Sequence, residues 1–366
     1  MGNVKYRMLL ESLRKDILSG KYASEQSFPS VRALSRRFGL ANTTVQRAVE
    51  ELAHQGLIQR SQGAGSIVTR AGALRKIGLV VPGIAYSEFF PVIVGEISRL
   101  ALANNYNLVF CDILSECPSQ RANQVLDFVS KLVNQGVAGV IFHPIECVRN
   151  ATRLNKTVVT MLDAAHVPVV LLDNDVLPPP DRSSYDLVGV NNFAAGQRLA
   201  THLIACGARR IHCMMYDFAA GSVRNRFEGV KSCVHKVKGV KTGFLCADPG
   251  DEKSVGDYVR KYRPDAFICG NDTVAALMGQ TLRKIGKRVP EDILLAGFDD
   301  LKHAILMTPQ LTTIHQPCEA LSRLAFDTLM ERMKNPAAMP REIYLPADLV
   351  IRESTRRIRP NRGKAK

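Results

Sequence analysis

Residues 29–54 read PSVRALSRRFGLANTTVQRAVEELAH and predict two helices joined by a tight turn. Pro29-Ser30 supplies an N-cap before an eight-residue amphipathic segment, and Gly39 stands where that helix would end. After the turn, Asn42 is a candidate N-cap for a second helix, whose apolar residues recur at helical spacing. This order of caps and apolar positions favours a helix-turn-helix.

The flanking segments complete a winged form of this motif. Leucine and isoleucine recur at helical spacing over 5–18 and predict a preceding helix, while 57–60 and 66–69 predict two short strands. The glycines of SQGAG (61–65) between these strands permit a tight hairpin turn. We therefore expect a winged helix-turn-helix DNA-binding domain over residues 1–70, followed by a linker at 71–76.

Several polar side chains are candidates for contact with DNA. A major groove accepts one helix whose first turn reaches the base edges, and a wing follows the neighbouring backbone. The candidate contacts are Arg32, Asn42, Thr43, Thr44, Gln46 and Arg47, with Gln62 and Gly63 at the wing tip. The alternative for the two arginines is a surface salt bridge, and the alternative for Asn42 is helix capping.

Segments 27–34, 42–49 and 56–66 resemble the GntR-type DNA-binding domain. Members of that family usually carry an arginine where Asn42 stands. Because asparagine pairs with adenine where arginine prefers guanine, we expect a different base preference at this position.

The charge distribution favours a polyanionic partner for the first segment. Residues 1–76 hold thirteen basic and five acidic side chains, whereas 77–355 hold thirty and twenty-nine. Residues 356–366 add six basic side chains and no acidic one, and we expect them to form a disordered tail. Neutralisation of phosphates supplies the sequence-independent part of DNA affinity, although solubility alone is the alternative interpretation.

From residue 77 onward, strand-sized apolar runs alternate with helical stretches, which is typical of doubly wound parallel sheets. The predicted strands are 77–81, 106–112, 137–143, 167–172, 187–190, 210–216, 241–246, 265–269 and 293–297. The predicted helices are 91–104, 119–135, 157–165, 192–206, 222–234, 251–262 and 272–285. We expect a two-lobed α/β domain over 77–355, with 77–186 and 316–343 in one lobe and 187–315 and 344–355 in the other.

Three segments, 264–272, 289–300 and 311–317, resemble the sugar-sensing domain of LacI-type repressors and the periplasmic sugar-binding proteins. The resemblance implies a homodimer with a sugar-like effector between the lobes, at the carboxyl ends of the strands. The candidate effector contacts are Phe89, as an apolar platform, with Asp173, Arg226, Asn271, Asp299 and Gln316. Interlobe packing is the alternative for several of them, and we expect Asp272 to cap the helix that follows it.

Other classes of protein fit the sequence less well. The nine cysteines form no Cys-x-x-Cys pair and the histidines no His-Glu-x-x-His spacing, so we expect no metal and no cofactor. A transport receptor predicts an export signal, and an aminotransferase-like enzyme predicts a Schiff-base lysine in a longer domain. We expect instead a cytoplasmic, non-enzymatic homodimeric repressor that binds operator DNA, makes no membrane contact and responds to a sugar.

Overall fold

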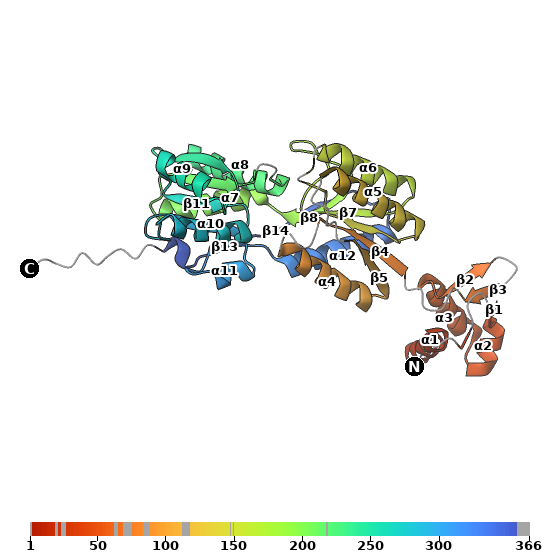
Figure 1. Ribbon diagram of the computed structural model, residues 1–366. Coiled ribbons are helices and arrows are strands. Elements are labelled where there is room, and N and C mark those ends of the chain that lie inside the picture. The colour runs from red at the N-terminus through yellow and green to blue at the C-terminus, as the bar shows by residue number, and fades with distance from the viewer. Residues whose placement is uncertain are drawn as a thin grey trace, which may run out of the picture. The chain divides into compact units, whose positions relative to one another are not determined.

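The computed structural model divides into two compact units, Met1–Arg75 and Lys76–Lys366 (Figure 1). The structure describes residues 2–18, 21–22, 27–61, 65–68, 75–82, 88–111, 118–146, 148, 150–216 and 219–356. Within these ranges, no helix combines the length and the apolar character that crossing a membrane requires. The boundary between the units falls inside the predicted linker, and the predicted basic tail lies outside the described residues apart from Arg356.

The first unit is the predicted winged helix-turn-helix. Its helices are α1 (Gly2–Leu18), α2 (Val31–Phe38) and α3 (Asn42–His54). Its antiparallel sheet has the order β1-β3-β2, from β1 (Ser27–Phe28), β2 (Ile58–Ser61) and β3 (Gly65–Val68). The helices and the sheet share one apolar cluster, in which Leu13, Leu34 and Leu52 are fully buried. Burial of these side chains holds the small domain together.

The caps of the helix-turn-helix differ from the prediction at one position. Ser30 Oγ accepts a hydrogen bond from the backbone N–H of Ala33 at 3.2 Å, as an N-cap should. Gly39 closes α2 with a φ of 63°, in the left-handed region. Asn42 is the first residue of α3, behind the N-cap residue Ala41, and its side chain makes no capping hydrogen bond. The expectation that Asn42 caps this helix was therefore wrong.

The second unit contains, among the described residues, two six-stranded sheets. The first has the order β14 (Glu342–Leu345), β8 (Asp186–Val190), β7 (Val169–Leu172), β6 (Val140–Phe142), β4 (Arg75–Val80), β5 (Tyr106–Phe110). The second has the order β10 (Lys241–Cys246), β9 (Arg210–Met215), β11 (Ala266–Cys269), β12 (Leu294–Asp299), β13 (Thr312–His315), β15 (Asp348–Val350). The strands from β14 to β4 run parallel, as do those from β10 to β13, whereas β15 is antiparallel to β13.

Helices pack in pairs against these sheets (Figure 1). The pairs of the first sheet are α4 (Phe89–Ala103) with α12 (Cys318–Lys334), and α5 (Pro118–Asn134) with α6 (Ala151–Ala164). The pairs of the second are α7 (Asn192–Ala205) with α8 (Gly221–His235), and α9 (Glu252–Tyr262) with α10 (Asp272–Lys284). The short helix α11 (Lys302–Leu306) follows β12. The predicted two-lobed, doubly wound domain is confirmed.

The partition of the chain between the two lobes was predicted wrongly at one strand. β8 was expected to open the second lobe, but it pairs in parallel with β7 of the first sheet, placing Leu187 beside Leu171. The chain therefore crosses between the lobes after β8, after β13 and after β14. An entirely buried strand such as β8 satisfies either sheet equally well, so its own sequence does not specify its partner.

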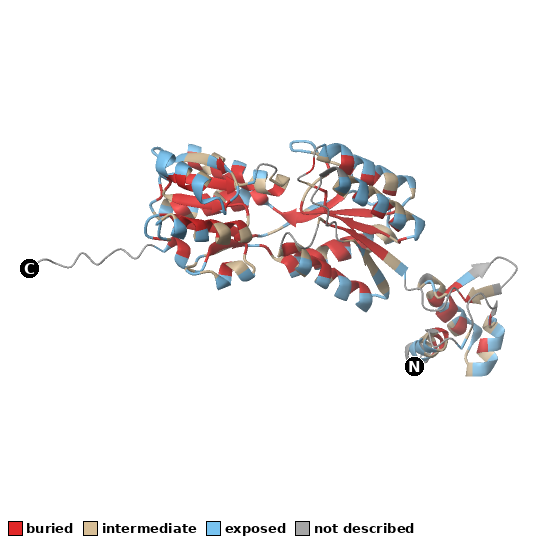
Figure 2. Cartoon of the chain, viewed as in Figure 1, coloured by how far each residue is buried: buried red, intermediate tan, exposed pale blue. Residues whose placement is uncertain are grey.

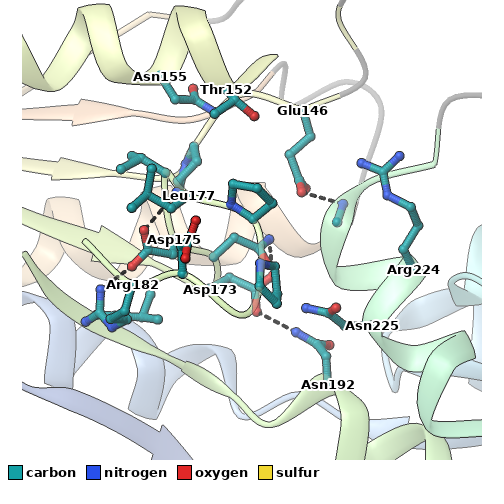
Figure 3. A pocket seen from close by; sticks show the side chains of 18 of the residues that line it. Glu146, Thr152, Asn155, Asp173, Asp175, Leu177, Arg182, Asn192, Arg224 and Asn225 are labelled. Carbon is teal, nitrogen blue, oxygen red and sulfur yellow. Dashed lines mark hydrogen bonds and ion pairs between the residues drawn. The ribbon is translucent and has the colours of Figure 1, made fainter. Parts of the chain in front are cut away.

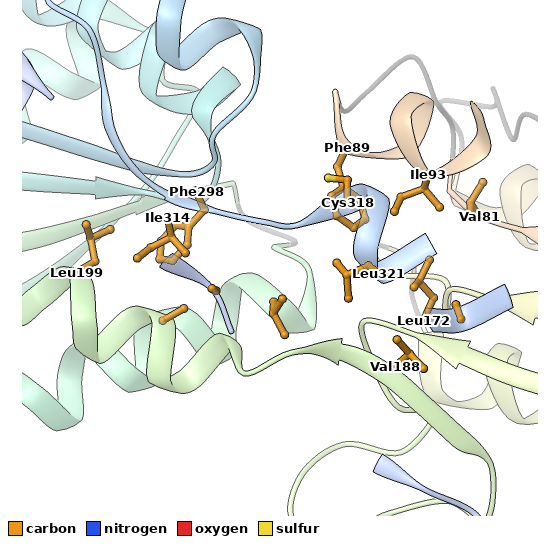
Figure 4. Close-up of a cluster of buried hydrophobic side chains, with 14 of the residues drawn as sticks. Val81, Phe89, Ile93, Leu172, Val188, Leu199, Phe298, Ile314, Cys318 and Leu321 are labelled. Atoms are coloured by element: carbon orange, nitrogen blue, oxygen red, sulfur yellow. The ribbon is translucent and has the colours of Figure 1, made fainter. Parts of the chain in front are cut away.

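The apolar core continues through both lobes of the second unit. Buried side chains follow the strands of each sheet (Figure 2). One cluster includes Leu172, Val188 and Leu321 of the first lobe and Phe298 and Ile314 of the second (Figure 4). Because this cluster borders the crossings, the segments that link the lobes are anchored in packed side chains.

Candidate DNA-binding surface and effector cleft

Helix α3 separates its side chains cleanly into a core face and an open face. The core face is Val45, Ala48, Val49 and Leu52. The open face is Asn42, Thr43, Gln46 and Arg47, all exposed, with Thr44 half-buried. The i, i+3, i+4 spacing of the core residues forces the residues between them outward at the first turns of the helix. These turns are the part of a recognition helix that reaches base edges.

The partners of these side chains leave them available at the surface. The Arg47 guanidinium lies over the ring of Tyr6, 4.8 Å from its centroid, and Gln46 Nε2 donates to Glu50 Oε1 at 3.2 Å. Arg32 is exposed on α2. Gln62 and Gly63, predicted at the wing tip, lie outside the described residues. The DNA contacts of all eight candidates stay predictions.

In the second unit, a chain of buried hydrogen bonds begins at the end of β7. Asp173 Oδ1 accepts from Asn192 Nδ2 at 3.2 Å, and Asn192 Oδ1 accepts from Arg226 Nε at 2.8 Å. The Nη1 of Arg226 donates to the carbonyl of Gly270 at 2.7 Å. Asn192 lies just after the first crossing, so these bonds tie a strand end of the first lobe to α8 and β11 of the second.

The series of buried polar contacts continues from Arg226 to the second crossing between the lobes, which follows β13. Arg226 Nη1 lies 3.8 Å from Asp299 Oδ1, and that oxygen accepts from Gln316 Nε2 at 2.6 Å. The Arg226 guanidinium also lies 4.6 Å from the centre of the Phe298 ring. Gln316 is 4% exposed, and its Oε1 has no hydrogen-bond partner among the described residues. A buried acceptor without a partner is costly, and a hydroxyl of a ligand would satisfy it.

Two aspartates in this buried network of hydrogen bonds and ion pairs, Asp173 and Asp299, have backbone conformations that are unusual for residues other than glycine. Asp173 has a φ of 65° and Asp299 a φ of 114°. Such conformations cost free energy and concentrate at ligand sites, where the surrounding packing enforces them. Both residues end a strand at the carboxyl edge of its sheet, the place where open α/β folds bind ligands.

The burial of these groups shifts their pKa values in different directions. Burial raises the pKa of Asp299 to about 6, although the Arg226 charge opposes the shift. Burial also raises the pKa of Asp272 well above its usual value, with the charge of Asp299 adding to the effect. For Asp173, burial acts upward, but His143, 3.8 Å away, and Arg226 outweigh it and lower the pKa. Of these three aspartates, Asp173 is therefore the most readily ionised.

A cavity of about 770 Å³ opens between the lobes beside this chain (Figure 3). Asp173 and Asn192 contribute to its wall from the polar chain. Glu146, Asp175, Arg182 and Arg224 line it further out, as do the apolar side chains of Leu177, Val190 and Phe193. A concave surface of this size, with converging polar groups, suits a small ligand.

Two carboxylates of the first lobe cap helices of the second. The carboxylate of Glu146 accepts from the backbone N–H of Gly221, the first residue of α8, and a Cβ added at Gly221 would lie 2.6 Å from Glu146 Oε1. Glu88 Oε2 accepts from the backbone N–H of His303 at 3.2 Å and lies 2.9 Å from its Nδ1. Helix N-termini favour negative charge, so both contacts hold the lobes together.

Each of the two units contains a segment that matches a known protein family. Residues 5–68 match the family model of bacterial regulatory proteins of the gntR family, and 200–355 match a periplasmic binding protein-like domain. The chain joins a GntR-type DNA-binding domain to a periplasmic-binding-protein-like domain. It is accordingly a transcription regulator, and we refer to it below as the regulator.

Similar proteins match the whole chain or about three quarters of it. The arabinose metabolism transcriptional repressor of Geobacillus stearothermophilus is 27% identical over 370 residues, covering 97% of the regulator and 98% of that repressor. The ribose operon repressor of Escherichia coli (strain K12) is 28% identical over 284 residues, covering 76% and 81%. A LacI family transcriptional regulator from Enterococcus faecium, solved with bound ribose, has a TM-score of 0.63 at 22% identity, covering 76% of the regulator and 98% of that chain.

The regulator's predicted effector residues are distributed unequally around the cleft. Asp173 lines the cavity, and Arg226, Asp299 and Gln316 follow behind it, linked by hydrogen bonds and by the Arg226–Asp299 ion pair. Phe89 is 5% exposed in the apolar core, so the platform role predicted for its ring does not fit its position. Its neighbour Phe90 is half-buried and meets the His143 ring edge-on, 5.0 Å between centroids.

Asn271, and not Asp272, caps helix α10. Asn271 Oδ1 accepts from the backbone N–H of Val274 at 2.8 Å and caps α10. Asp272 is 1% exposed and accepts from Thr313 Oγ1 at 2.7 Å, so the expectation that it caps the helix was wrong. Because Asn271 Oδ1 is engaged in the cap, only the amide nitrogen of this side chain would be available to a ligand.

Sequence reasoning missed Asn192, His143 and Glu146. Each follows the carboxyl end of a strand of the first sheet, β8 for Asn192 and β6 for the other two. The rule that selected Asp173, a polar residue directly after a parallel strand, would have found His143, whereas Asn192 and Glu146 lie two and four residues beyond their strands.

Proposed function

We propose that the regulator is a homodimeric repressor that binds operator DNA through α3 and changes its DNA affinity when a small sugar binds between the lobes. The observation that carries this proposal is the buried chain from Asp173 to Gln316 through Arg226. It passes two of the three segments that cross between the lobes, after β8 and after β13, so a ligand that contacts one end acts on the connections between the lobes. The names of the arabinose and ribose repressors among the similar proteins support the same proposal.

The DNA-binding part of the proposal rests on the open face of α3 and on the basic excess of residues 1–76. In a two-fold dimer, two such helices would occupy half-sites separated by about 34 Å, one turn of B-DNA, or by a multiple of it. Apolar side chains offer a surface for the second copy. Leu102 on α4 is 68% exposed, and Ile305 and Leu306 on α11 are 52% and 78% exposed.

The sensing part rests on differential binding. A sugar shifts a conformational equilibrium only by the amount that it prefers one state over the other. A coupling free energy of about 1–3 kcal/mol changes operator affinity about 5- to 150-fold, which is enough for a switch. We expect the sugar to stabilise closed lobes and to weaken DNA binding.

A gel-shift titration of the full chain tests both parts. DNA fragments selected by the regulator from a random pool are titrated with and without arabinose or ribose at one salt concentration. We expect a sugar to weaken the shift. Arg226→Lys, which keeps the charge but loses the guanidinium fork, should abolish the sugar effect and retain DNA binding. Arg47→Ala should weaken the shift, while Arg153→Ala, at an exposed position on α6, should not.

Two outcomes contradict the proposal separately. If no sugar at saturating concentration changes the shift, the induction model fails while DNA binding stands. If Arg47→Ala binds the selected DNA as the native chain does, α3 is not the recognition helix.

A further inference from the structure

The cleft carries an excess of negative charge. Its acidic lining residues, among those described, are Glu146, Asp173, Asp175, Asp181, Glu228 and Glu342. Its basic lining residues are Arg182 and Arg224. A cleft lined by charges of one sign focuses their field on a ligand. This excess of acidic over basic lining residues disfavours an effector that carries an anionic group.

Arg182 is already committed to the protein. Its Nη1 pairs with the carboxylate of Asp175, and its Nη2 donates to the carbonyl of Tyr185 at 2.8 Å. Its Nε lies 3.8 Å from Glu342 Oε2. A phosphate that recruited Arg182 would have to separate it from these partners and leave Asp175 unpaired.

The two other arginines of the region do not restore the balance. Arg226 is 4% exposed and is bonded to Asn192 and to the carbonyl of Gly270, with Asp299 3.8 Å away. Arg224 is exposed; its charge acts on Glu146, but Figure 3 places its guanidinium away from Asp173 and Asn192. Carboxylates therefore outnumber arginines in the lining of the cleft.

Glu146 occupies the position in the cleft that would otherwise suit an anion. The first backbone N–H groups of a helix form a ready site for phosphate. Here the N–H of Gly221 at the start of α8 already donates to the Glu146 carboxylate (Figure 3). Burial raises the pKa of Glu146 and the charge of Asp173 adds to the shift, whereas the charges of His143 and Arg224 and the hydrogen bond from Gly221 oppose it. A phosphate placed beside Glu146 would either be repelled or force it to take up a proton.

The remaining polar atoms favour hydroxyl groups. The carboxylates of Asp173 and Glu146, which line the cavity, accept hydrogen bonds. A ligand rich in hydroxyl donors would satisfy both. The buried Oε1 of Gln316 is a further acceptor without a partner among the described residues, but Gln316 lies behind the cavity and is not one of its lining residues.

We infer that the cleft selects an uncharged, hydroxyl-rich effector over its phosphate ester, and that Glu146 enforces this selection by occupying the N-terminus of α8. The inference deepens the proposed function and rests on it, because both place the effector in the same cleft. Removing the charge of Glu146 should weaken the discrimination, and vacating the helix terminus should weaken it more.

The test compares each sugar with its ester on the full chain without DNA, by isothermal titration calorimetry. The pairs are arabinose with arabinose 5-phosphate and ribose with ribose 5-phosphate, with inorganic phosphate as a further probe. We expect one sugar to bind and its ester to bind at least tenfold more weakly. In Glu146→Gln the ratio should fall, and in Glu146→Ala it should fall further. Glu319→Gln, at an exposed position on α12 outside the cleft lining, should keep the native ratio.

The outcomes distinguish the two proposals. An ester that binds the native chain as tightly as its sugar, or more tightly, overturns the charge inference but leaves the effector cleft in place. A native ratio that persists in both Glu146 variants overturns the assignment to Glu146. If neither sugars nor esters bind, the proposed sugar response fails and this inference fails with it.

Discussion

The two units of the regulator place their functional side chains in opposite environments. On α3 of the first unit, Asn42, Gln46 and Arg47 lie exposed on a helix whose other face forms the core. In the second unit, Arg226 and Asp299 are 4% and 7% exposed and are held by one another and by their neighbours. Surface side chains can change without disturbing the fold, whereas substitutions among the buried residues are expected to lower stability as well as the proposed ligand binding. Substitutions should therefore separate the two functions by their effect on the free energy of unfolding.

The largest effect is expected at Arg226. Arg226→Ala leaves the buried carboxylate of Asp299 without its cation, which costs about 3–5 kcal/mol of unfolding free energy. Denaturant unfolding of the second unit measures this loss. Arg210→Ala is the matched control, because Arg210 is exposed, pairs with Asp265 and should cost about 0.2–1 kcal/mol. Equal stability of the two variants would contradict the structural importance of the buried chain.

The pH dependence of stability should reveal Asp299. Its pKa is raised to about 6 in the folded chain, so the folded state holds a proton that the unfolded state releases at lower pH. Stability contributed by the neutral carboxyl is therefore lost as pH rises from about 4 to about 6, by as much as about 3 kcal/mol. Subtracting the urea-unfolding profile of Asp299→Asn from that of the native chain isolates this slope. Asp181→Asn, at an exposed position, should leave the profile unchanged. A difference profile that is flat over this range would refute the assignment.

Gly221 tests the contact between the lobes. In Gly221→Ala, the new Cβ would lie 2.6 Å from Glu146 Oε1, so the carboxylate must move off the start of α8. Because the crowded atom is the end of a flexible side chain, the cost is mainly the lost hydrogen bond to the Gly221 N–H, and we expect a loss of about 0.5–1.5 kcal/mol, measured by thermal and denaturant unfolding. Gly95→Ala on α4 is the control, because its Cβ meets no atom within 4 Å and should stabilise the helix by about 0.5–1 kcal/mol. Similar effects at the two glycines would argue against a close interlobe contact.

Ser30 tests the first unit in the same way. Ser30→Ala removes the side-chain acceptor for the N–H of Ala33 at the start of α2 and should cost about 1 kcal/mol. Because the two units are compact separately, the loss should appear in unfolding of the DNA-binding unit and leave sugar binding unchanged. Ser98→Ala, at an exposed position within α4, should have little effect on either. A loss of sugar affinity in Ser30→Ala would show that the units are not energetically separate.

The smallest effect on stability, with a large effect on function, is expected at Arg47. Arg47→Ala removes an exposed side chain and should change unfolding free energy by less than about 0.5 kcal/mol. If Arg47 contacts a base edge, DNA binding should weaken by about 1–3 kcal/mol. Fluorescence anisotropy with labelled selected DNA measures the change, alongside denaturant unfolding. A variant that loses stability but not affinity would reverse the comparison between the two units.

Local patterns in the sequence were sufficient for the first unit. The N-cap at Ser30, the left-handed Gly39 and the apolar spacing of α3 were all predicted, because caps and helical faces depend on residues within one or two turns. Asn42 is the exception in this region. Ala41 takes the N-cap position, and an asparagine side chain that makes no cap bond is left exposed at the first turn.

In the second unit, the sequence by itself determined the alternation of strands and helices, and it selected Asp173, Arg226, Asp299 and Gln316 through position and resemblance. It did not determine that β8 joins the first sheet, that Asn192 bridges Asp173 to Arg226, or that Glu146 caps α8. Those contacts were decided by the tertiary structure. Periodicity reports which face of an element is buried, whereas the partner across a crossing is fixed only when distant segments pack together.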